Sequence, residues 1–299
     1  MQLIHGLDAM TGSLTPSAVT VGNFDGVHRG HRALLDGVVA AARARGLSSL
    51  AMTFDPHPAA ILAPERAPRL LMPVERRIEL MAQSGLDGIV LQPFDRAFSN
   101  LTAAQFLDRV LRTALGARCL VVGPDFRFGA GRRGTAETLS GSGLDVVRVP
   151  QVSEEGRPIS SSRIRDVVAS GDVRLAGRLL GHPHEIIGKV IKGDGRGRKM
   201  GVPTANLDLE TMLGPADGVY AGRVDLAEGS FLAVVNIGVR PTVSAGRAVE
   251  VHLLDFDGPL HGLRLVVRLD RRLREERRFP SLDALKEQIA RDIEDARTP

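Results

Sequence analysis

The chain has 299 residues, of which 43% are hydrophobic and 25% charged, so it has the composition of a folded globular protein and a length that suits two domains. Its 39 Lys and Arg residues only slightly exceed its 35 Asp and Glu residues, which suits an enzyme of phosphorylated anions and argues against a nucleic-acid-binding protein. A single cysteine, Cys119, excludes an intrachain disulfide and a thiolate metal cluster, and the apolar run around it predicts a buried side chain.

No apolar run has the length of a membrane span, and residues 1–10 lack the basic start and the long apolar stretch of a secretory signal. We therefore expect a cytoplasmic protein without a membrane partner. The expected partners are small molecules, and the sequence leaves open whether copies of the chain form a transient homo-oligomer.

Short apolar runs alternate with helical patterns through the first half of the chain. Strands are predicted over residues 18–21, 47–54, 88–91, 117–123 and 144–149, and helices over residues 30–45, 74–83, 102–113 and 162–180. This alternation predicts an α/β fold with a doubly wound parallel sheet and helices on both faces. Ligands of such sheets bind beyond the carboxyl ends of the strands, where we expect the chemistry.

The second half is rich in strands and poor in helical patterns. Strands are predicted over residues 219–224, 231–237, 249–256 and 263–269, which indicates a small antiparallel β-barrel or sandwich. A terminal helix is predicted to begin after Ser281 and to pack on the barrel. The apolar residues of that helix are Leu282, Leu285, Ile289 and Ile293. The break at residues 181–184 separates two predicted domains, 1–183 and 184–299.

The strongest local feature of the first half is Val-Gly-Asn-Phe-Asp-Gly-Val-His-Arg-Gly-His, residues 21–31, between the first of these strands and the first long helix. His28 and His31 are three residues apart, so they share one face at a helix N-terminus, which attracts phosphates. Two imidazoles there would stabilise charge on a pentavalent phosphorus, and Gly30 would let the backbone approach the phosphates. The alternative is a pair of histidines that only begin a helix.

This segment resembles the His-x-Gly-His signature of the nucleotidyltransferase superfamily, and in its longer form the adenylyltransferase domain of prokaryotic FAD synthetases. Segments 53–58, 123–129 and 159–165 match that family in the same order. The resemblance implies a domain that adenylylates FMN to FAD with ATP and releases pyrophosphate. It also implies that His28 and His31 are catalytic.

The same resemblance implies further site residues. Those for the nucleotide are Gly22, Phe24, Gly30, Ser161, Ser162, Arg163 and Arg165, and those for the flavin are Phe54, Asp125, Phe126 and Phe128. Serine hydroxyls and arginines suit phosphate oxygens, and aromatic rings suit stacking on a flavin, although each Phe could equally belong to the core. The chain departs from the family at Asp125, where Asn is frequent, and at Ser162, where Thr is frequent. The added charge of Asp125 leaves its role open.

A glycine-rich segment, residues 188–206, marks the second half. Its glycines would wrap phosphates with backbone N–H groups, although a flexible basic loop is the plainer alternative. Thr204 and Asn206 point the same way on an extended segment, and both offer oxygens that suit Mg²⁺ held partly by ATP. Further on, Glu250 and His252 share one face of a predicted strand, and a carboxylate there would accept a hydroxyl proton.

These segments resemble the riboflavin kinase domain, and residues 236–242, 273–279 and 288–292 match it as well. The resemblance implies that Thr204 and Asn206 bind Mg²⁺ and that Glu250 is the catalytic base. It places Gly193, Gly195 and Arg198 at the nucleotide. One departure is His261, where the family has Tyr.

With both resemblances in one chain, the leading interpretation is a bifunctional enzyme: riboflavin is phosphorylated to FMN, and FMN is converted to FAD. A second interpretation keeps one activity only, with Asp125 as the reason to suspect a weakened adenylyltransferase. A third is a flavin- or nucleotide-sensing protein without catalysis. A nucleic-acid-binding barrel would bind with a steep salt dependence, but few aromatic residues lie near its basic ones.

Overall fold

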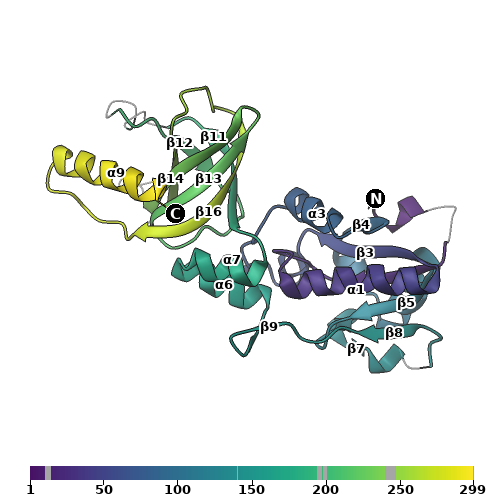
Figure 1. Ribbon diagram of the computed structural model, residues 1–299. Coiled ribbons are helices and arrows are strands. Elements are labelled where there is room, and N and C mark those ends of the chain that lie inside the picture. The colour runs from purple at the N-terminus through teal and green to yellow at the C-terminus, as the bar shows by residue number, and fades with distance from the viewer. Residues whose placement is uncertain (11–14, 140, 194–196, 198–200, 240–246, 299) are drawn as a thin grey trace. The chain divides into compact units, whose positions relative to one another are not determined.

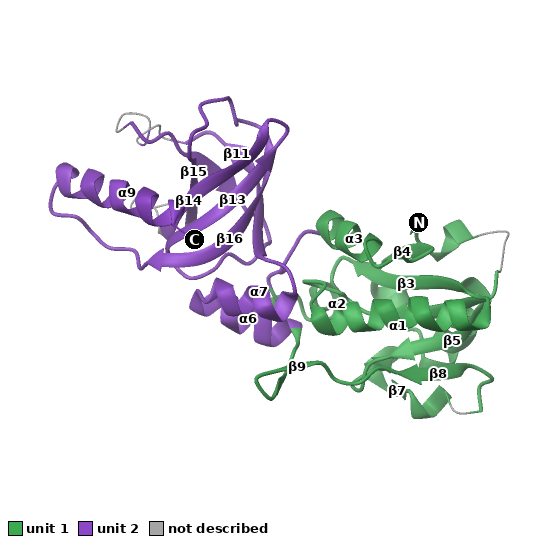
Figure 2. Cartoon of the chain, in the orientation of Figure 1, with its two compact units in different colours: residues 1–68, 74–160 green, residues 69–73, 161–299 purple. Residues whose placement is uncertain are grey.

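The computed structural model describes residues 1–10, 15–139, 141–193, 197, 201–239 and 247–298, with the side chains of Val239 and Arg247 left aside (Figure 1). The chain forms two compact units (Figure 2). Unit 1 comprises residues 1–68 and 74–160, and unit 2 comprises residues 69–73 and 161–299.

Unit 1 contains the predicted parallel sheet. Its strands are β1 (Gln2–His5), β2 (Ser17–Val21), β3 (Ser48–Asp55), β4 (Gly88–Pro93), β5 (Ala117–Val122) and β8 (Asp145–Arg148), in the order β1-β4-β3-β2-β5-β8 and all parallel. The five predicted strands are confirmed, and β1 adds an edge strand that its short, mixed sequence did not predict. Because β2 lies between β3 and β5, the winding reverses there, and the carboxyl end of β2 is the expected place for a ligand.

Helices and short connections surround this sheet. They are η1 (Leu7–Met10), α1 (Arg29–Arg45), α2 (Pro58–Leu62), η2 (Pro64–Arg66), α3 (Val74–Ala82), α4 (Arg96–Ser99), α5 (Ala103–Gln105), η3 (Phe106–Ala114), η4 (Ala130–Arg132) and η5 (Glu137–Leu139). Two short hairpins pair β6 (Arg127–Phe128) with β7 (Gly134–Thr135) and β9 (Ser153–Glu154) with β10 (Arg157–Pro158). Thr102 caps α5, because its hydroxyl accepts from the Gln105 backbone while the Gln105 side chain accepts from the Thr102 backbone.

Side chains of the strands alternate between two layers of core. Leu50, Met52 and Phe54 of β3 pack in one hydrophobic cluster with Phe106 and Leu111 of η3. Helix α1 packs across β2, β3 and β5. It buries the side chains of Leu35, Val38, Ala41 and Ala42. Cys119 is fully buried in β5, as its apolar neighbours predicted. The alternation of period two therefore buries both faces of the sheet, as a doubly wound fold requires.

Unit 2 contains a closed six-stranded barrel. Its strands are β11 (His184–Ile191), β12 (Ala205–Asp208), β13 (Gly218–Leu226), β14 (Gly229–Val239), β15 (Arg247–Leu253) and β16 (Arg264–Arg274), in the order β11-β12-β15-β14-β13-β16 and all antiparallel. Alternate residues fill the interior, among them Val249, Val251 and Leu253 of β15. Of the two predicted alternatives, barrel and sandwich, the barrel is confirmed.

The terminal helix α9 (Leu282–Arg297) begins after the predicted N-cap Ser281, whose hydroxyl accepts from the Ala284 backbone at 3.2 Å. It packs on the outside of the barrel, as predicted. The predicted apolar face is wrong in part, because Leu282 is 55% exposed. The most buried residues of α9 are Gln288, Asp292 and Ala296, since the helix is docked by polar contacts as well as by apolar ones.

Two further features belong to unit 2. The predicted helix 162–180 is two helices, α6 (Ser161–Ser170) and α7 (Val173–Leu180), because Gly171 adopts φ 86° and Asp172 caps α7. Residues 69–73 also belong here: the Leu70 N–H donates to the Thr211 carbonyl at 3.2 Å, and the Leu213 N–H donates to the Leu70 carbonyl at 2.8 Å. The compact units thus divide the chain at residue 160, while the predicted domain boundary at 183 rests on sequence alone.

We predict that His184, the first residue of β11, makes the barrel sensitive to acid. Its side chain is fully buried, and desolvation, aided by the charge of His182, lowers its pKa from 6.5 to about 4. The unfolded chain therefore binds a proton that the folded chain excludes as the pH falls from 6.5 towards 4. About 3 kcal/mol of unfolding free energy should be lost across that window.

Chemical denaturation followed by tyrosine fluorescence measures this loss, because the only tyrosine, Tyr220, is buried in the barrel. His184→Gln should remove this part of the pH dependence whatever its effect on stability at pH 7. The prediction would be contradicted if the free energy of unfolding fell equally with pH in the wild-type protein and in His184→Gln.

Candidate active sites

The two histidines of the first motif lie at the start of α1, directly after the loop that leaves β2. His28 is the N-cap, and its Nδ1 accepts a hydrogen bond from the His31 backbone N–H at 3.1 Å. The two rings are stacked, with centroids 3.5 Å apart and planes 14° from parallel. Because Nδ1 of His28 is the acceptor, its neutral ring carries the proton on Nε2, which makes Nε2 a hydrogen-bond donor. The structure therefore brings the predicted pair together.

Glycines keep space open around this pair. A methyl group at Gly30 would lie 3.1 Å from Cε1 of His28, closer than side chains normally approach. A methyl group at Gly22 would lie 3.3 Å from the ring of Phe24. Phe24 itself is fully buried, and its ring meets His31 edge-on at 5.3 Å between centroids. The described contacts of Phe24 therefore support the histidines from the core.

The predicted flavin residues belong to a chain of aromatic contacts in unit 1. Phe54 and Phe128 are buried, Phe126 is half-buried, and Asp125 is exposed. The rings of Phe126 and Phe128 are stacked at 5.5 Å, and contacts through Phe106, Phe98 and Phe94 continue to Phe54. Phe54 and Phe128 are thus core residues, and Phe126 is the predicted ring with most access to a ligand.

Sequence reasoning missed Arg77, on α3, which connects two of the motif segments. This side chain is only 4% exposed. It donates to the Asn23 carbonyl at 2.8 Å and to the Phe54 carbonyl at 2.7 Å. The Asn23 amide in turn contacts Nε2 of His57 at 3.2 Å. An arginine on the buried face of an amphipathic helix could have marked this residue as one with a specific role. The sequence does not show which carbonyls its side chain reaches.

The remaining residues predicted for the nucleotide open helix α6 in unit 2. They are Ser161, Ser162, Arg163 and Arg165. Arg165 donates through Nε to the Arg69 carbonyl at 2.9 Å, which links α6 to segment 69–73. A helix that starts with two hydroxyls and two arginines is suited to an anion.

In the barrel, three polar residues form a row across three neighbouring strands. Glu250 of β15 pairs with Asn206 of β12 on one side and with Asn236 of β14 on the other. Because Val249 and Val251 point inward, Glu250 and both its partners point outward. Directly opposed side chains have Cβ atoms about 5 Å apart, so the carboxylate lies between two amides. Asn236 was not among the predicted site residues, since only strand register identifies it.

The glycine-rich segment packs directly on the predicted metal ligands. A methyl group at Gly193 would overlap the amide of Asn206, and one at Gly197 would lie 3.0 Å from the hydroxyl of Thr204. Asn206 is consequently only 8% exposed although it faces outward. Gly195 and Arg198, the other nucleotide residues predicted there, lie outside the described residues.

A polar network fixes the segment that follows β16. Arg274 forms a forked ion pair with the buried carboxylate of Asp292, with Nε–Oδ1 and Nη2–Oδ2 distances of 2.9 and 2.8 Å. Gln288 donates to the same carboxylate at 2.8 Å. The Glu276 side chain then lies where a side chain on Gly238 would be, two residues beyond the polar row of β14. Helix α9 thereby places a carboxylate beside that strand.

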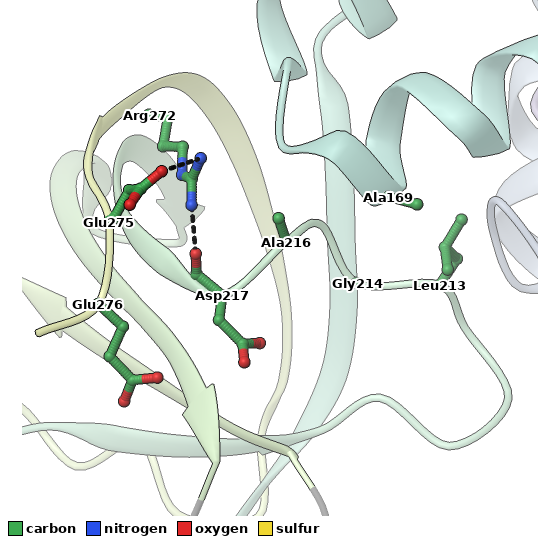
Figure 3. A pocket seen from close by; sticks show the side chains of 8 residues that line it. All are labelled: Ala169, Leu213, Gly214, Ala216, Asp217, Arg272, Glu275 and Glu276. Atoms are coloured by element: carbon green, nitrogen blue, oxygen red, sulfur yellow. Dashed lines mark hydrogen bonds and ion pairs between the residues drawn. The ribbon is translucent and has the colours of Figure 1, made fainter.

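A hollow of about 680 Å³ opens on unit 2 (Figure 3). Its wall carries Asp217, Glu275 and Glu276, and Arg272 donates to the Asp217 carbonyl at 2.5 Å. None of the predicted site residues that the structure describes lines it. Carboxylates repel phosphate groups, so this hollow does not suit a nucleoside triphosphate.

Comparisons with known proteins match the two parts of the chain to two family models. A family model described as FAD synthetase matches residues 11–163, and one described as riboflavin kinase matches residues 180–299. The bifunctional riboflavin kinase/FMN adenylyltransferase of Escherichia coli strain K12 is 43% identical over 98% of this chain and 96% of its own. That of Bacillus subtilis strain 168 is 36% identical over 94% and 91%. A crystal structure described as a macrolide-efflux protein from Streptococcus pneumoniae is 33% identical, covers 100% of both chains and has a TM-score of 0.90.

We predict that Gly30→Ala weakens ATP binding about tenfold at the site beside the histidine pair and leaves the other ATP site unchanged. The added methyl group would displace the His28 ring from the position in which it can donate a hydrogen bond to ATP. Calorimetric titration with a non-hydrolysable ATP analogue measures this change. Gly37→Ala is the matched control: it lies on the same helix, and its methyl would meet a Val149 methyl at 3.1 Å, away from the histidines. Equal affinities in the two variants would contradict the prediction.

Proposed function

The chain belongs to the family of bifunctional riboflavin kinases/FMN adenylyltransferases, and from this we infer that it catalyses two successive steps of flavin synthesis. The C-terminal domain transfers the γ-phosphoryl group of ATP to riboflavin, which forms FMN. The N-terminal domain transfers AMP from ATP to FMN, which forms FAD and releases pyrophosphate.

One observation carries this proposal. Two different family models match the two halves of one chain, each on the fold that suits its chemistry. The parallel sheet has a helix N-terminus with two imidazoles at the carboxyl end of β2, which suits nucleotidyl transfer. The barrel has a carboxylate between two amides on its outer face, which suits phosphoryl transfer to a hydroxyl. An alternative with a single activity would leave one of these arrangements without a purpose.

In the adenylylation step, a phosphate oxygen of FMN attacks the α-phosphorus of ATP. The new P–O bond forms as the bond to the pyrophosphate oxygen breaks, and no covalent enzyme intermediate is needed. His28 donates from Nε2 to an oxygen whose charge grows in the transition state, and the stacked His31 ring supplies a second donor. Ser161, Ser162, Arg163 and Arg165 would hold phosphate oxygens, and Gly22 and Gly30 would let the backbone approach them. Phe126 would contact the flavin, with Phe54 and Phe128 behind it.

In the kinase step, the terminal ribityl hydroxyl of riboflavin attacks the γ-phosphorus of ATP, and ADP leaves. Glu250 accepts the hydroxyl proton, since its carboxylate faces outward beside Asn206. Asn236, opposite Glu250 on β14, would orient that carboxylate from the other side. The glycine backbone at residues 193 and 197, with Gly195 and Arg198 nearby in sequence, would wrap the phosphates.

Mg²⁺ fits the residues of the barrel site. Among the residues that the structure describes, no group of three or more His, Cys, Asp or Glu side chains is placed to hold a metal. The donors that the glycine backbone encloses are the Thr204 hydroxyl and the Asn206 amide, hard oxygen ligands that leave most positions for water and ATP phosphates. When bound, Mg²⁺ would neutralise charge on the transferred phosphoryl group.

Location and assembly stay predictions from the sequence. No helix in the described ranges combines the length and apolar character of a bilayer span. We propose a cytoplasmic enzyme whose partners are ATP and flavins and which does not bind nucleic acid, with domains 1–183 and 184–299.

We predict that single substitutions separate the two steps. Glu250→Gln should slow the formation of FMN from riboflavin by about 10²–10⁴-fold because it removes the base, while FAD still forms from supplied FMN. His31→Ala should slow the formation of FAD from FMN by at least about tenfold, while FMN still forms from riboflavin. Chromatographic separation of the flavins over time measures both steps in one mixture.

A wild-type protein that leaves riboflavin unchanged would refute the kinase assignment. One that makes FMN but no FAD, even from supplied FMN, would refute the adenylyltransferase assignment. Loss of both steps in either variant would show that the sites are not separate.

We also predict that Asn206→Ala raises the Mg²⁺ concentration for half-maximal kinase activity about tenfold or more, because one oxygen ligand is lost. The Mg²⁺ dependence of FAD formation from FMN should not change, since that step uses the other domain. Asp208→Ala, two residues along the same strand and exposed, is the control. An unaltered kinase Mg²⁺ curve would remove Asn206 from the metal site.

A further inference from the structure

The loop after β2 and the carboxyl end of β3 meet at one buried guanidinium of the adenylyltransferase domain. The loop leads to His28, and Phe54 is the second-last residue of β3. Arg77, on α3, donates from Nη1 to the Asn23 carbonyl at 2.8 Å and from Nη2 to the Phe54 carbonyl at 2.7 Å. Two donors of one planar fork thus reach the loop after β2 and the end of β3, which the single ammonium of lysine cannot reproduce.

The loop after β2 needs such an anchor because its backbone is strained. Phe24 adopts φ 49° and Val27 adopts φ 39°, in the left-handed region that bulky and β-branched residues avoid. Each such residue costs about 1–3 kcal/mol and persists only where its surroundings hold it. The Asn23 carbonyl, directly before the strained stretch, accepts from both Arg77 and the Thr53 hydroxyl, the latter at 3.1 Å. These bonds hold the start of the loop while His28 caps α1 at its end.

Electrostatics also keep the guanidinium in place. Burial lowers the pKa of Arg77, and the carboxylates of Asp25, Asp55 and Glu75 act against that effect. Asp25 belongs to the strained loop and is only 1% exposed. Nε of Arg77 finds no hydrogen-bond partner in the described part of the chain, so the side chain is not fully satisfied by its bonds. Burying a charged group with an unsatisfied N–H costs free energy, and a side chain that served only to stabilise the core would not carry that cost.

We propose that Arg77 is a positioning residue for adenylyl transfer: by joining the Asn23 and Phe54 carbonyls, it fixes the loop that sets His28 and His31 against the nucleotide. This proposal rests on the proposed adenylyltransferase function. Arg77 acts through the backbone and does not contact the reacting atoms. A displacement of about 1 Å in a catalytic group can cost about a hundredfold in rate, so the effect should appear in kcat.

The decisive variant is Arg77→Lys, which keeps the positive charge near Asp25 and removes the fork. It should lower kcat for FAD formation from FMN about tenfold or more, and Arg77→Met about a hundredfold, with KM values for ATP and FMN within about threefold of wild type. FMN formation from riboflavin, measured on the same molecules, should not change. Arg76→Met is the matched control, since its side chain pairs at the surface with Glu79.

A double-mutant cycle tests the route of the effect. Thr53→Val removes the other donor to the Asn23 carbonyl, so the losses in Arg77→Lys and Thr53→Val should be non-additive. A full rate of FAD formation in Arg77→Lys would overturn the proposal. The proposal would also be overturned if the melting temperature of Arg77→Lys fell so far that unfolding of the variant accounts for its loss of rate. If the wild-type chain makes no FAD from FMN, the adenylyltransferase function fails and the proposal fails with it. If the wild-type chain and Arg77→Lys form FAD from FMN at the same rate, the role proposed for Arg77 is refuted and the adenylyltransferase function stands.

Discussion

Both sites depend on glycine backbone packed directly against a functional side chain. Gly30 leaves the room in which the His28 ring caps α1, and Gly193 lies against the amide of Asn206. In each place a side chain on the glycine would push the functional group away. The folds differ, a parallel sheet in one unit and a closed antiparallel barrel in the other, but each brings backbone close to a side chain that we propose binds a ligand, because glycine has no side chain there. Phosphate recognition by main-chain N–H groups requires this closeness.

The two units reach phosphate chemistry by different physical means. In unit 1 the helix N-terminus supplies partial positive charge, and His28 and His31 add donors where the winding of the sheet reverses. In unit 2 the alternation of a barrel strand turns Glu250 outward between two amides, while its neighbours fill the core. In the proposed mechanism, the first arrangement stabilises charge on phosphorus, and the second accepts a proton. One chain therefore holds the two functions that successive transfer steps to a flavin need.

The sequence predicted what local patterns encode. Apolar runs and turn residues located five of the six parallel strands and four of the six barrel strands, and the His-x-Gly-His spacing located the start of α1. What it could not predict depends on register and distant contacts. Asn236 joins Glu250 only because β14 pairs with β15 in one register, and Arg77 reaches two carbonyls that lie 54 and 23 positions away. The apolar face of α9 was partly wrong because Asp292 is buried by an ion pair, which hydropathy does not reveal.

The short segment 69–73 has a consequence for dissecting the chain. It belongs to the barrel-bearing unit although the residues on either side of it belong to the other, so the polypeptide passes between the units at residues 68, 73 and 160. A fragment that stops at residue 160 would contain Leu70 without Thr211 and Leu213, the residues that pair with its backbone. A fragment that starts at residue 161 would in turn lack Leu70. Expressing the halves separately therefore removes a tertiary contact from each, and full-length protein with one site inactivated is the cleaner way to study either activity.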